Sequence, residues 1–455
     1  MRVIVIGGGI SGLSCAWRLH QLGAAVLLLE QSPRAGGVIK TVAPDGCLFE
    51  CGPQSFLSTD GLLDLIRSVG LDQELLRADP KAPRYVVRGG RLESVPLSPG
   101  ALLSSPLLSR RSKFALLAEP FRRRRPLPED ESVAEFVRRE FSEELLERLV
   151  APMVSGIYAG DPERLSLRSA FPAVYAWKKE HGSVIRGAIK SRPAKDKPAS
   201  TLCTLRDGVA ALPRRIAEQL GAAVVTGARV LSVKRLKANG SRQFKIHFEI
   251  QGRAETTTAD AVVLAAPADV AGQILQLVSL RFPALLGQIA YAPVGVLSAA
   301  YRQSDLAQPL RGFGFLVPRP ERLRVLGTIW NSSLFPGRAP EGQVVLTSFV
   351  GGATDTAMLG GSDDEIRAVV EREVGGVLGI SSPPAAHHLQ RWTRAIPQYN
   401  LGHAHILAAL HEELRLCPGL FLAGNYLEGP AIGACVALGT RMADEAHQYV
   451  LGKGL

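Results

Sequence analysis

The chain has 455 residues, 46% of them hydrophobic, and a formal net charge of +11. This length predicts roughly two or three domains with enough apolar content for a sizeable core. The six cysteines show no repeated CxxC spacing, which argues against a zinc site or a disulfide framework and fits a reducing, cytosolic compartment. No run of about 18 apolar residues predicts a membrane span. Because an apolar strand begins right after Met1, we also expect no targeting peptide.

The positive charge is concentrated in one segment. Residues 81–200 carry 23 Lys and Arg against 14 Asp and Glu. Within Ala101–Pro128, leucine-rich patches alternate with cations, namely Arg110, Arg111, Lys113 and the run Arg122–Arg125. The mixture predicts a surface that lies on an anionic membrane without crossing it, with a solvated basic face as the alternative. Aromatic residues are not interleaved with these arginines, so we expect no nucleic-acid partner.

The N-terminal segment has the pattern of a nucleotide-binding unit. The β-branched run Arg2–Ile6 predicts a buried strand, and a helix is expected from about Ser11 to Leu22. Between them Gly7 permits a tight turn, and Gly9 removes the side chain that would block a pyrophosphate. Gly12 allows the helix to pack closely on the sheet. The helix N-terminus offers free N–H groups to the phosphates.

The continuation of this segment distinguishes between two cofactors. A second strand is expected at Ala25–Leu29, and Glu30 follows it at the spacing at which a carboxylate accepts ribose hydroxyls. These features alone fit NAD or FAD. The stretch Gln31–Gly37 (QSPRAGG) adds the cation of Arg34 and a glycine pair beside the same pyrophosphate. A second clamp suits a cofactor that stays bound, so FAD is favoured.

This signature resembles that of the flavin amine oxidase superfamily. The resemblance continues in Phe49–Phe56 (FECGPQSF), a loop that lies by the isoalloxazine ring in such enzymes, and in Pro418–Gly439, a strand, glycine turn and helix. It departs at Ala434, where the family is usually acidic, and at Gln54, where many members have asparagine. The resemblance implies FAD contacts by Gly7, Gly8, Gly9, Ile10, Ser11, Gly12, Glu30, Gln31, Arg34, Gly37, Val38, Gly52, Pro53, Gln54, Ser55, Val230, Gly424, Asn425, Pro430, Ala431 and Ile432.

The predicted fold class is α/β with a discontinuous flavin domain. Two short strands in Ala222–Leu236 and a buried strand in Ala259–Asp269 supply its middle part. We expect three domains. They are a Rossmann-like FAD-binding domain (residues 1–78, 200–270 and 415–455), a mixed-sheet substrate domain (79–92 and 271–414) and an inserted helical, membrane-associating domain (93–199).

Four further motifs narrow the resemblance to one family. They are Val154–Pro172 (VSGIYAGDPERLSLRSAFP), Lys179–Ile189 (KEHGSVIRGAI), Gly312–Pro318 (GFGFLVP) and Arg394–His403 (RAIPQYNLGH). In this order they resemble the oxygen-dependent porphyrinogen oxidases of haem biosynthesis. The resemblance implies oxidation of protoporphyrinogen IX to protoporphyrin IX, six electrons in all, with molecular oxygen as acceptor; coproporphyrinogen III is the alternative substrate. No metal and no catalytic group beyond flavin N5 are expected, because the neighbouring pyrroles drive hydride loss.

The substrate is expected to lie in an apolar slot. Arg84 is the candidate for a substrate propionate, because a guanidinium matches a carboxylate bidentately; a surface salt bridge is the alternative. The resemblance places the walls of the slot at Phe313, Gly314, Leu316, Ile329 and Phe349. The alternative for each wall residue is an ordinary position in a core strand.

Two rival functions remain open. One is another oxidase or desaturase of the same fold, acting on amines or carotenoids, and the other is a non-catalytic flavin or haem carrier. Further candidate partners are a second copy of the chain in a homodimer and the neighbouring haem-pathway enzyme. We expect a cytoplasmic protein at the inner face of the cell membrane.

Overall fold

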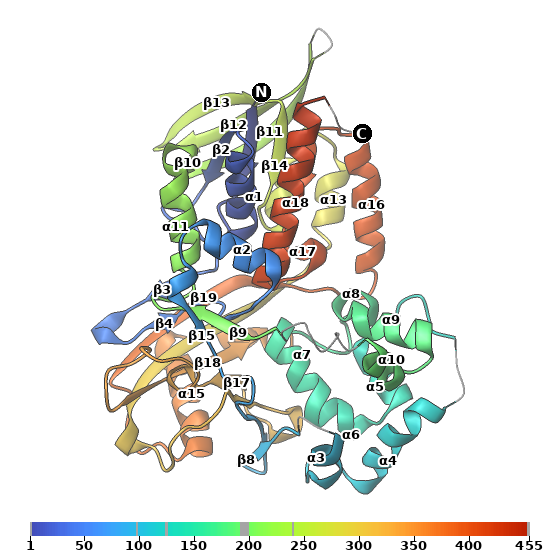
Figure 1. The fold of residues 1–455 in the computed structure, drawn as a ribbon, viewed down its shortest axis with the longest axis vertical. Coiled ribbons are helices and arrows are strands. Elements are labelled where there is room, and N and C mark those ends of the chain that lie inside the picture. Colours follow the sequence, from blue (N-terminus) through green and yellow to red (C-terminus); the bar gives the residue numbers. More distant parts are fainter. Residues whose placement is uncertain (1, 97–98, 123–125, 192–199, 239–240, 453–455) are drawn as a thin grey trace.

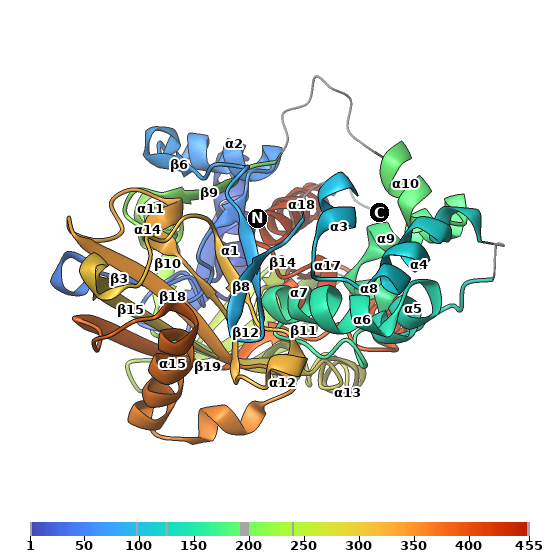
Figure 2. The same ribbon diagram turned by 90° about the horizontal axis from the view of Figure 1, so that it is seen from below.

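The computed structural model describes residues 2–96, 99–122, 126–191, 200–238 and 241–452. Figure 1 shows a sheet flanked by helices at the top, a second sheet at the lower left and a helical region at the lower right. Both termini lie at the top. Seen from below in Figure 2, the helical region stands beside the second sheet.

The upper sheet has five parallel strands in the order β10-β2-β1-β14-β20. They are β1 (Arg2–Ile6), β2 (Ala25–Glu30), β10 (Val224–Thr226), β14 (Ala261–Leu264) and β20 (Leu420–Leu422). Ile4 of the central strand lies between Leu27 and Val262 and is fully buried. A strand covered on both faces needs a continuous apolar sequence. The β-branched run therefore forms the buried strand that was predicted for Arg2–Ile6.

Both faces of the upper sheet are covered. On one face lie α1 (Ile10–Gln21), α2 (Asp60–Ser68), α11 (Ala211–Leu220) and α18 (Ile432–Val450). The other face packs against the antiparallel strands β11 (Ala228–Ala238), β12 (Ser241–Ile250) and β13 (Arg253–Ala259) and against α12 (Ala268–Ile274), α13 (Arg281–Leu286) and α16 (His403–Arg415). This doubly covered parallel sheet confirms the predicted α/β class.

The lower sheet has seven strands in the order β19-β15-β18-β17-β16-β7-β8. They are β19 (Ala386–Pro397), β15 (Tyr291–Arg302), β18 (Gln343–Gly351), β17 (Val325–Ile329), β16 (Gly314–Leu316), β7 (Arg84–Arg88) and β8 (Arg91–Ser94). The pair β16–β7 is parallel and the others are antiparallel, which confirms the predicted mixed sheet. Helix α15 (Asp363–Leu378) packs on one face.

The helical region lies between β8 and the return of the chain to the upper sheet. Its helices are α3 (Pro99–Ser104), α4 (Arg110–Ala118), α5 (Val133–Glu140), α6 (Glu143–Leu145), α7 (Ala151–Tyr158), α8 (Leu167–Ala170), α9 (Pro172–His181) and α10 (Val184–Lys190). In the part of the chain that the structure describes, no helix combines the length and the apolarity needed to cross a bilayer. Three residues of the arginine run, 123–125, lie outside the described residues.

The division into three domains stays a prediction. The strand membership supports it, because β7 and β8 join the lower sheet although most of that sheet comes from residues after 290. The short strands β5 (Phe56–Leu57), β6 (Leu75–Arg77) and β9 (Leu202–Leu205) form a small sheet of their own.

Candidate active site

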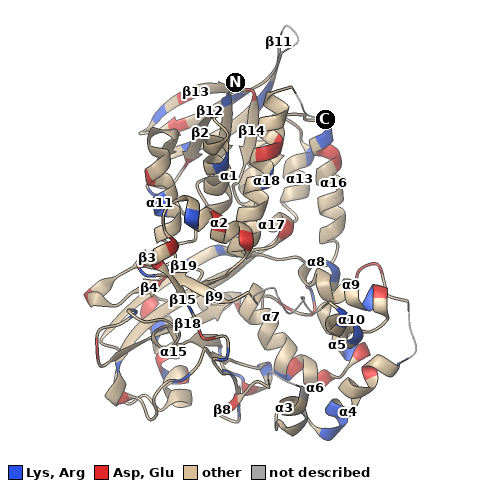
Figure 3. Ribbon diagram, in the orientation of Figure 1, with Lys and Arg blue, Asp and Glu red and all other residues tan. Residues whose placement is uncertain are grey.

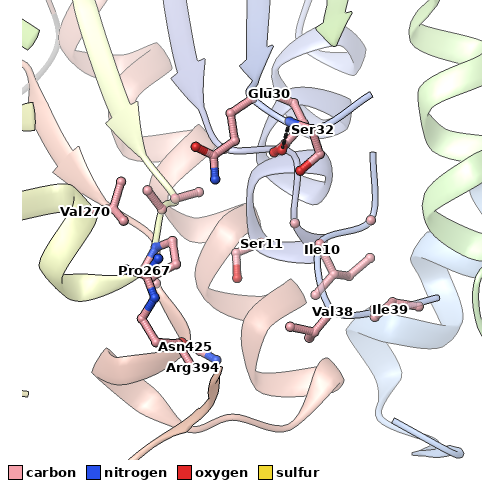
Figure 4. A pocket seen from close by; sticks show the side chains of 18 of the residues that line it. Ile10, Ser11, Glu30, Ser32, Val38, Ile39, Pro267, Val270, Arg394 and Asn425 are labelled. Carbon is pink, nitrogen blue, oxygen red and sulfur yellow. Dashed lines mark hydrogen bonds between the residues drawn. The ribbon is translucent and has the colours of Figure 1, made fainter. Parts of the chain in front are cut away.

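A cavity of about 420 Å3 lies between the N-termini of α1 and α18 and the ends of β1, β2 and β14 (Figure 4). Its lining includes most of the predicted flavin contacts. These are Gly7, Gly9, Ile10, Ser11, Glu30, Gln31, Arg34, Gly37, Val38, Pro53, Val230, Gly424, Asn425, Pro430 and Ile432. Segments from both ends and the middle of the chain therefore meet in one cavity, as the motifs predict.

The glycines of the first turn are required for different structural reasons. Gly7 has φ +107°, and a Cβ there would lie 2.7 Å from the carbonyl oxygen of Ala265. A Cβ on Gly12 would lie 1.9 Å from the carbonyl oxygen of Gly7. A Cβ on Gly9 would meet no atom within 4 Å, because it would project into the cavity. Gly7 and Gly12 are thus required by the fold, whereas Gly9 leaves room for a ligand.

The N-terminus of α1 supports an anionic ligand. Its N-cap is Gly9, and no side chain caps the first turn of this 12-residue helix. Ile10 and Ser11 of that turn line the cavity. Free N–H groups at such an end, with the partial positive charge of the helix, suit a phosphate. The open space at Gly9 and this uncapped turn together fit the pyrophosphate of a dinucleotide.

Glu30 is buried at the edge of the cavity, with 7% of its surface exposed. Its Oε2 accepts a hydrogen bond from the Gly8 N–H at 2.6 Å, and its Oε1 accepts one from the Ser32 N–H at 2.7 Å, which Figure 4 shows. A carboxylate has about four acceptor positions, so Glu30 retains capacity for ribose hydroxyls. Gly8 lies directly behind it, since a Cβ on Gly8 would be 2.9 Å from the Glu30 Cβ.

Arg34 holds the second glycine loop together. Its guanidinium donates to the carbonyl oxygens of Gly37 at 2.7 Å, Ile39 at 3.0 Å and Ala35 at 3.2 Å while it lines the cavity. The Gly36 N–H donates to the Gly8 carbonyl at 2.7 Å and so ties this loop to the first turn. The stretch Gln31–Gly37, predicted as a second clamp, is therefore a loop whose backbone carbonyls are held by the Arg34 side chain.

The loop Gly52–Ser55 contributes to the cavity through Pro53. Gln54 is 7% exposed, and its side chain does not line the cavity. Its Nε2 donates to the carbonyls of Gly52 at 2.9 Å and Glu50 at 3.0 Å, and its Oε1 accepts from Asn331 Nδ2 at 2.8 Å. The amide thus fixes the loop. The other predicted contacts outside the lining are Gly8, Gly12, Gly52, Ser55 and Ala431.

The C-terminal turn closes the cavity. Gly424 lies against the ring of Tyr426, since a Cβ there would be 2.0 Å from a ring carbon. Asn425 begins the short helix α17 (Asn425–Glu428). Ala431 is the N-cap of α18, and no side chain caps that 19-residue helix either. Its free N–H groups lie beside Ile432, which lines the cavity.

Strands β15 and β19 supply cavity residues that sequence reasoning missed. They are Tyr291, Arg391, Trp392, Thr393, Arg394 and Ala395. Trp392 Nε1 donates to the Cys51 carbonyl at 2.6 Å, and the Tyr291 hydroxyl accepts from the Ala268 N–H at 2.9 Å. The motif that begins at Arg394 carried only the family resemblance, and nothing in its residue types indicated a cofactor.

The predicted substrate residues do not line this cavity. Instead, the strand registers place five of them, Arg84, Gly314, Leu316, Ile329 and Phe349, on one face of the lower sheet, and Phe313 directly precedes β16. In one row Arg84 is opposite Gly314, Gly314 is opposite Ile329, and Ile329 is opposite Thr347. Residues directly opposite one another on paired strands share a face.

A second row on the same face leads to the cavity. Leu316 is opposite Gly327, which is opposite Phe349, and Phe349 is opposite Val296. Trp392, which lines the cavity, is opposite Val294, two residues from Val296. The face that carries the predicted slot residues is thus continuous with the cavity wall.

The surroundings of this face differ from one residue to the next. Arg84 is exposed, and its guanidinium lies over the Phe313 ring, 5.5 Å from the centroid. Phe313 and Ile329 pack against a small cluster with Phe335. At the other row, α7 contacts the sheet, since a Cβ on Gly156 would lie 3.0 Å from Leu316 Cδ2. Helix α7 therefore packs on part of this face, at β16 and β17.

Comparison with known proteins gives a consistent result. The family model for flavin containing amine oxidoreductases matches residues 10–447. Protoporphyrinogen oxidase 1, chloroplastic, of Arabidopsis thaliana is 34% identical over 480 residues, covering 98% of this chain and 88% of that protein. Coproporphyrinogen III oxidase of Bacillus subtilis (strain 168) is 29% identical over 472 residues, covering 98% of both. A solved structure from Exiguobacterium sp. 255-15 matches with a TM-score of 0.82 at 25% identity, covering 97% of this chain and 98% of that chain.

These matches extend over the whole fold and agree with the cavity. They confirm the predicted superfamily and the predicted FAD cofactor. The chain belongs to the family of flavin-containing amine oxidoreductases, and within it to the group of the protoporphyrinogen and coproporphyrinogen oxidases.

Proposed function

We propose that the protein catalyses the FAD-dependent, six-electron oxidation of protoporphyrinogen IX to protoporphyrin IX. The observation that carries this proposal is the sheet face that joins Trp392, at the cavity, to Arg84. An apolar sheet face that starts at the cavity and ends at a cation matches a macrocycle with apolar rings and carboxylate arms. The likeness to porphyrinogen oxidases along nearly the whole chain supports the same substrate class.

The proposed cofactor contacts follow from the cavity. Backbone N–H groups at the start of α1 bind the pyrophosphate where Gly9 leaves space, and Glu30 accepts from the ribose. Val230 lines the adenine side, and Asn425 with the N-terminus of α18 holds the flavin side. When bound, FAD supplies a hydride acceptor at N5 that takes two electrons at a time.

The protein's own part in the reaction is orientation. Leu316, Ile329 and Phe349 present an apolar wall that excludes water and holds the macrocycle flat. Arg84 binds one propionate, and the two N–H groups of its fork fix the rotation of the ring system. No side chain is required as an acid or base at the reacting carbon, because the adjacent pyrroles stabilise the positive charge that hydride loss leaves there.

Coproporphyrinogen III is the second candidate substrate. The likeness to the Bacillus subtilis coproporphyrinogen III oxidase favours it, and that relative covers this chain as completely as the plant enzyme does. Porphyrin fluorescence during turnover of each porphyrinogen tests the proposal. We expect activity on both, with protoporphyrinogen slightly preferred; absence of both activities would refute the proposed function.

The helical region supports a further proposal, peripheral attachment to the cytoplasmic, inner face of the cell membrane. Among the described residues of this region, six large apolar side chains are exposed, and the four most exposed are Phe114 (73%), Leu117 (51%), Phe121 (84%) and Ile189 (57%). Figure 3 shows Lys and Arg on α4, close to these positions in the sequence. A cavity of about 330 Å3 is lined by Arg122, Glu180, His181, Gly182, Arg186 and Lys190. Apolar anchors beside cations favour anionic lipid.

Vesicle co-sedimentation tests this attachment. We expect binding to vesicles with anionic lipid, loss of that binding at high salt, and little binding to neutral vesicles. Equal binding to both vesicle types would contradict the electrostatic part of the attachment.

The proposed function also includes molecular oxygen as the electron acceptor. Oxygen uptake during turnover tests it. Association with a second copy or with the neighbouring haem-pathway enzyme stays a prediction.

A further inference from the structure

The segment Pro397–His403 (PQYNLGH) connects three parts of the molecule. It begins at the last residue of β19 in the lower sheet and ends at the first residue of α16, whose lower end stands over α8 in Figure 1. The Gln398 N–H donates to the Ala290 carbonyl at 2.8 Å, at the entry to β15. Neither the proposed cofactor contacts nor the slot residues include any member of this segment.

On one side the segment reaches the flavin turn. The Tyr399 hydroxyl donates to the carbonyl oxygen of Asn425 at 2.6 Å, and His403 Nε2 lies 3.0 Å from the carbonyl oxygen of Tyr426. The two rings are stacked, with centroids 4.4 Å apart and an interplanar angle of 9°. Tyr399 and His403 are 3% and 2% exposed, so water cannot replace these bonds. Two consecutive carbonyls of the turn are thus held by one buried pair.

The protonation states of this pair follow from the geometry. A carbonyl oxygen only accepts, so both ring groups must donate. Burial raises the pKa of Tyr399, which keeps the phenol protonated. Burial lowers the pKa of His403 to about 4. The hydrogen bond to the Tyr426 carbonyl and the negative charge of Asp130 raise this pKa, but their effect is smaller than that of burial. At neutral pH the imidazole is therefore neutral, and its single proton is on Nε2.

On its other side the segment holds the helical region. The Ser166 N–H donates to the Tyr399 carbonyl at 2.8 Å, and Gln398 Nε2 donates to the Tyr158 carbonyl at 2.8 Å. The Gly402 N–H donates to Asp130 Oδ2 at 2.7 Å. Tyr158 ends α7, the helix whose Gly156 contacts the slot residue Leu316. The same few residues therefore touch the helix over the substrate face and the turn at the cavity.

We propose that Tyr399 and His403 are positioning residues that fix the Asn425 and Tyr426 carbonyls and so set the turn that faces the flavin. This inference rests on the proposed assignment of that turn to FAD. The orientation of a peptide group determines where its neighbour's N–H and side chain point. A turn released from the pair presents Asn425 to the flavin in several orientations, which weakens cofactor binding and alters the flavin absorbance spectrum.

The decisive comparison uses two buried tyrosines that each donate to a carbonyl. Tyr399→Phe keeps the stacked ring and removes the bond to Asn425. Tyr158→Phe is the matched control, because its hydroxyl donates to the Ala170 carbonyl at 2.8 Å, inside the helical region. We expect Tyr399→Phe to weaken FAD binding to apoprotein about tenfold and to shift the flavin absorbance bands. Tyr158→Phe is expected to change affinity less than about twofold.

A second pair of variants separates the donor from the ring. His403→Gln keeps an N–H donor and should retain FAD more tightly than His403→Leu, which has none. Thermal unfolding of each apoprotein shows whether a variant is folded. Equal FAD affinities and spectra for Tyr399→Phe and Tyr158→Phe, both folded, would overturn the inference. Failure of the wild-type protein to bind FAD would instead overturn the proposed function.

Discussion

The flavin cavity and the proposed substrate face, which carries Arg84, Gly314, Leu316, Ile329 and Phe349, are built in different ways. At the cavity the decisive features are backbone features, such as the bare backbone at Gly9 and the uncapped start of α1. The substrate face is made of side chains from β7, β16, β17 and β18, which come together only through strand register. A site made of backbone leaves a short, local pattern in the sequence. A site made of side chains leaves scattered residues of ordinary types.

The largest effect is expected from the glycines of the first turn. Gly12→Ala places a Cβ 1.9 Å from the Gly7 carbonyl oxygen and should lower the free energy of unfolding by about 3 kcal/mol or more. The methyl group added by Gly9→Ala meets no protein atom, so the free energy of unfolding of the apoprotein should stay within about 1 kcal/mol of the wild-type value. Its methyl group occupies the phosphate space, and FAD affinity should fall about 100-fold. Thermal unfolding and FAD titration measure the two effects.

These two variants test whether the glycines act differently. If both lower the stability of the apoprotein alike, then Gly9 serves the fold and not the cofactor. If Gly9→Ala binds FAD as tightly as wild type, the phosphate lies elsewhere in the cavity.

The next effect is expected at the far end of the substrate face. Arg84→Met keeps a long apolar stem over Phe313 and removes the charge. Loss of a charge-assisted bond to a propionate should raise KM for the porphyrinogen about 10- to 30-fold, with FAD affinity unchanged. The control is Arg91→Met on the neighbouring strand β8, where KM should stay within about twofold of wild type. Similar KM values for the two variants would remove Arg84 from the substrate site.

A smaller effect concerns pH and the loop at the cavity. Glu50 lies just before the loop Gly52–Ser55 and is 2% exposed. Burial raises the pKa of its carboxyl group to about 7. The hydrogen bonds from Thr41 and from the Val209 N–H, and the charge of Arg338, act in the opposite direction and lower this pKa. The raised pKa means that the folded protein binds a proton that the unfolded chain releases. Stability should therefore fall as pH rises from about 4.5 to about 7, by roughly 1–3 kcal/mol.

Glu50→Gln should remove that slope while leaving stability near pH 4.5 little changed, because the neutral amide resembles the protonated carboxyl. Urea unfolding across this pH range is the measurement. A variant with the same pH slope as wild type would show that another group is responsible.

The smallest effect is expected for Gln54→Asn. The shorter amide cannot make all three hydrogen bonds of Gln54, so the bond to Asn331 should be lost at a cost of about 1 kcal/mol in stability. FAD should stay bound, and turnover should change less than about tenfold, since the side chain does not line the cavity. Release of FAD on purification would show that this amide holds the cofactor after all.

The sequence was most informative where local physics fixes the structure. The strand Arg2–Ile6, the helix α1 and the strand that ends at Glu30 were predicted within a residue or two, because each depends on a short run. The cavity residues Trp392 and Tyr291 were missed, because strand alternation does not show which residues will end beside a distant turn. The bonding of Gln54 to Asn331, 277 positions later, was equally invisible. The substrate face could be named only through resemblance to a family.

The proposed reaction is the oxidation, by a flavin in the cavity, of a porphyrinogen held on the adjoining sheet face. Its most direct measurement is anaerobic mixing of the FAD-loaded protein with protoporphyrinogen IX, followed by flavin absorbance and porphyrin fluorescence. We expect bleaching of the oxidised flavin on mixing, with restoration of its absorbance and growth of porphyrin fluorescence when oxygen is admitted. A flavin that stays oxidised with both protoporphyrinogen and coproporphyrinogen would contradict it and favour a carrier.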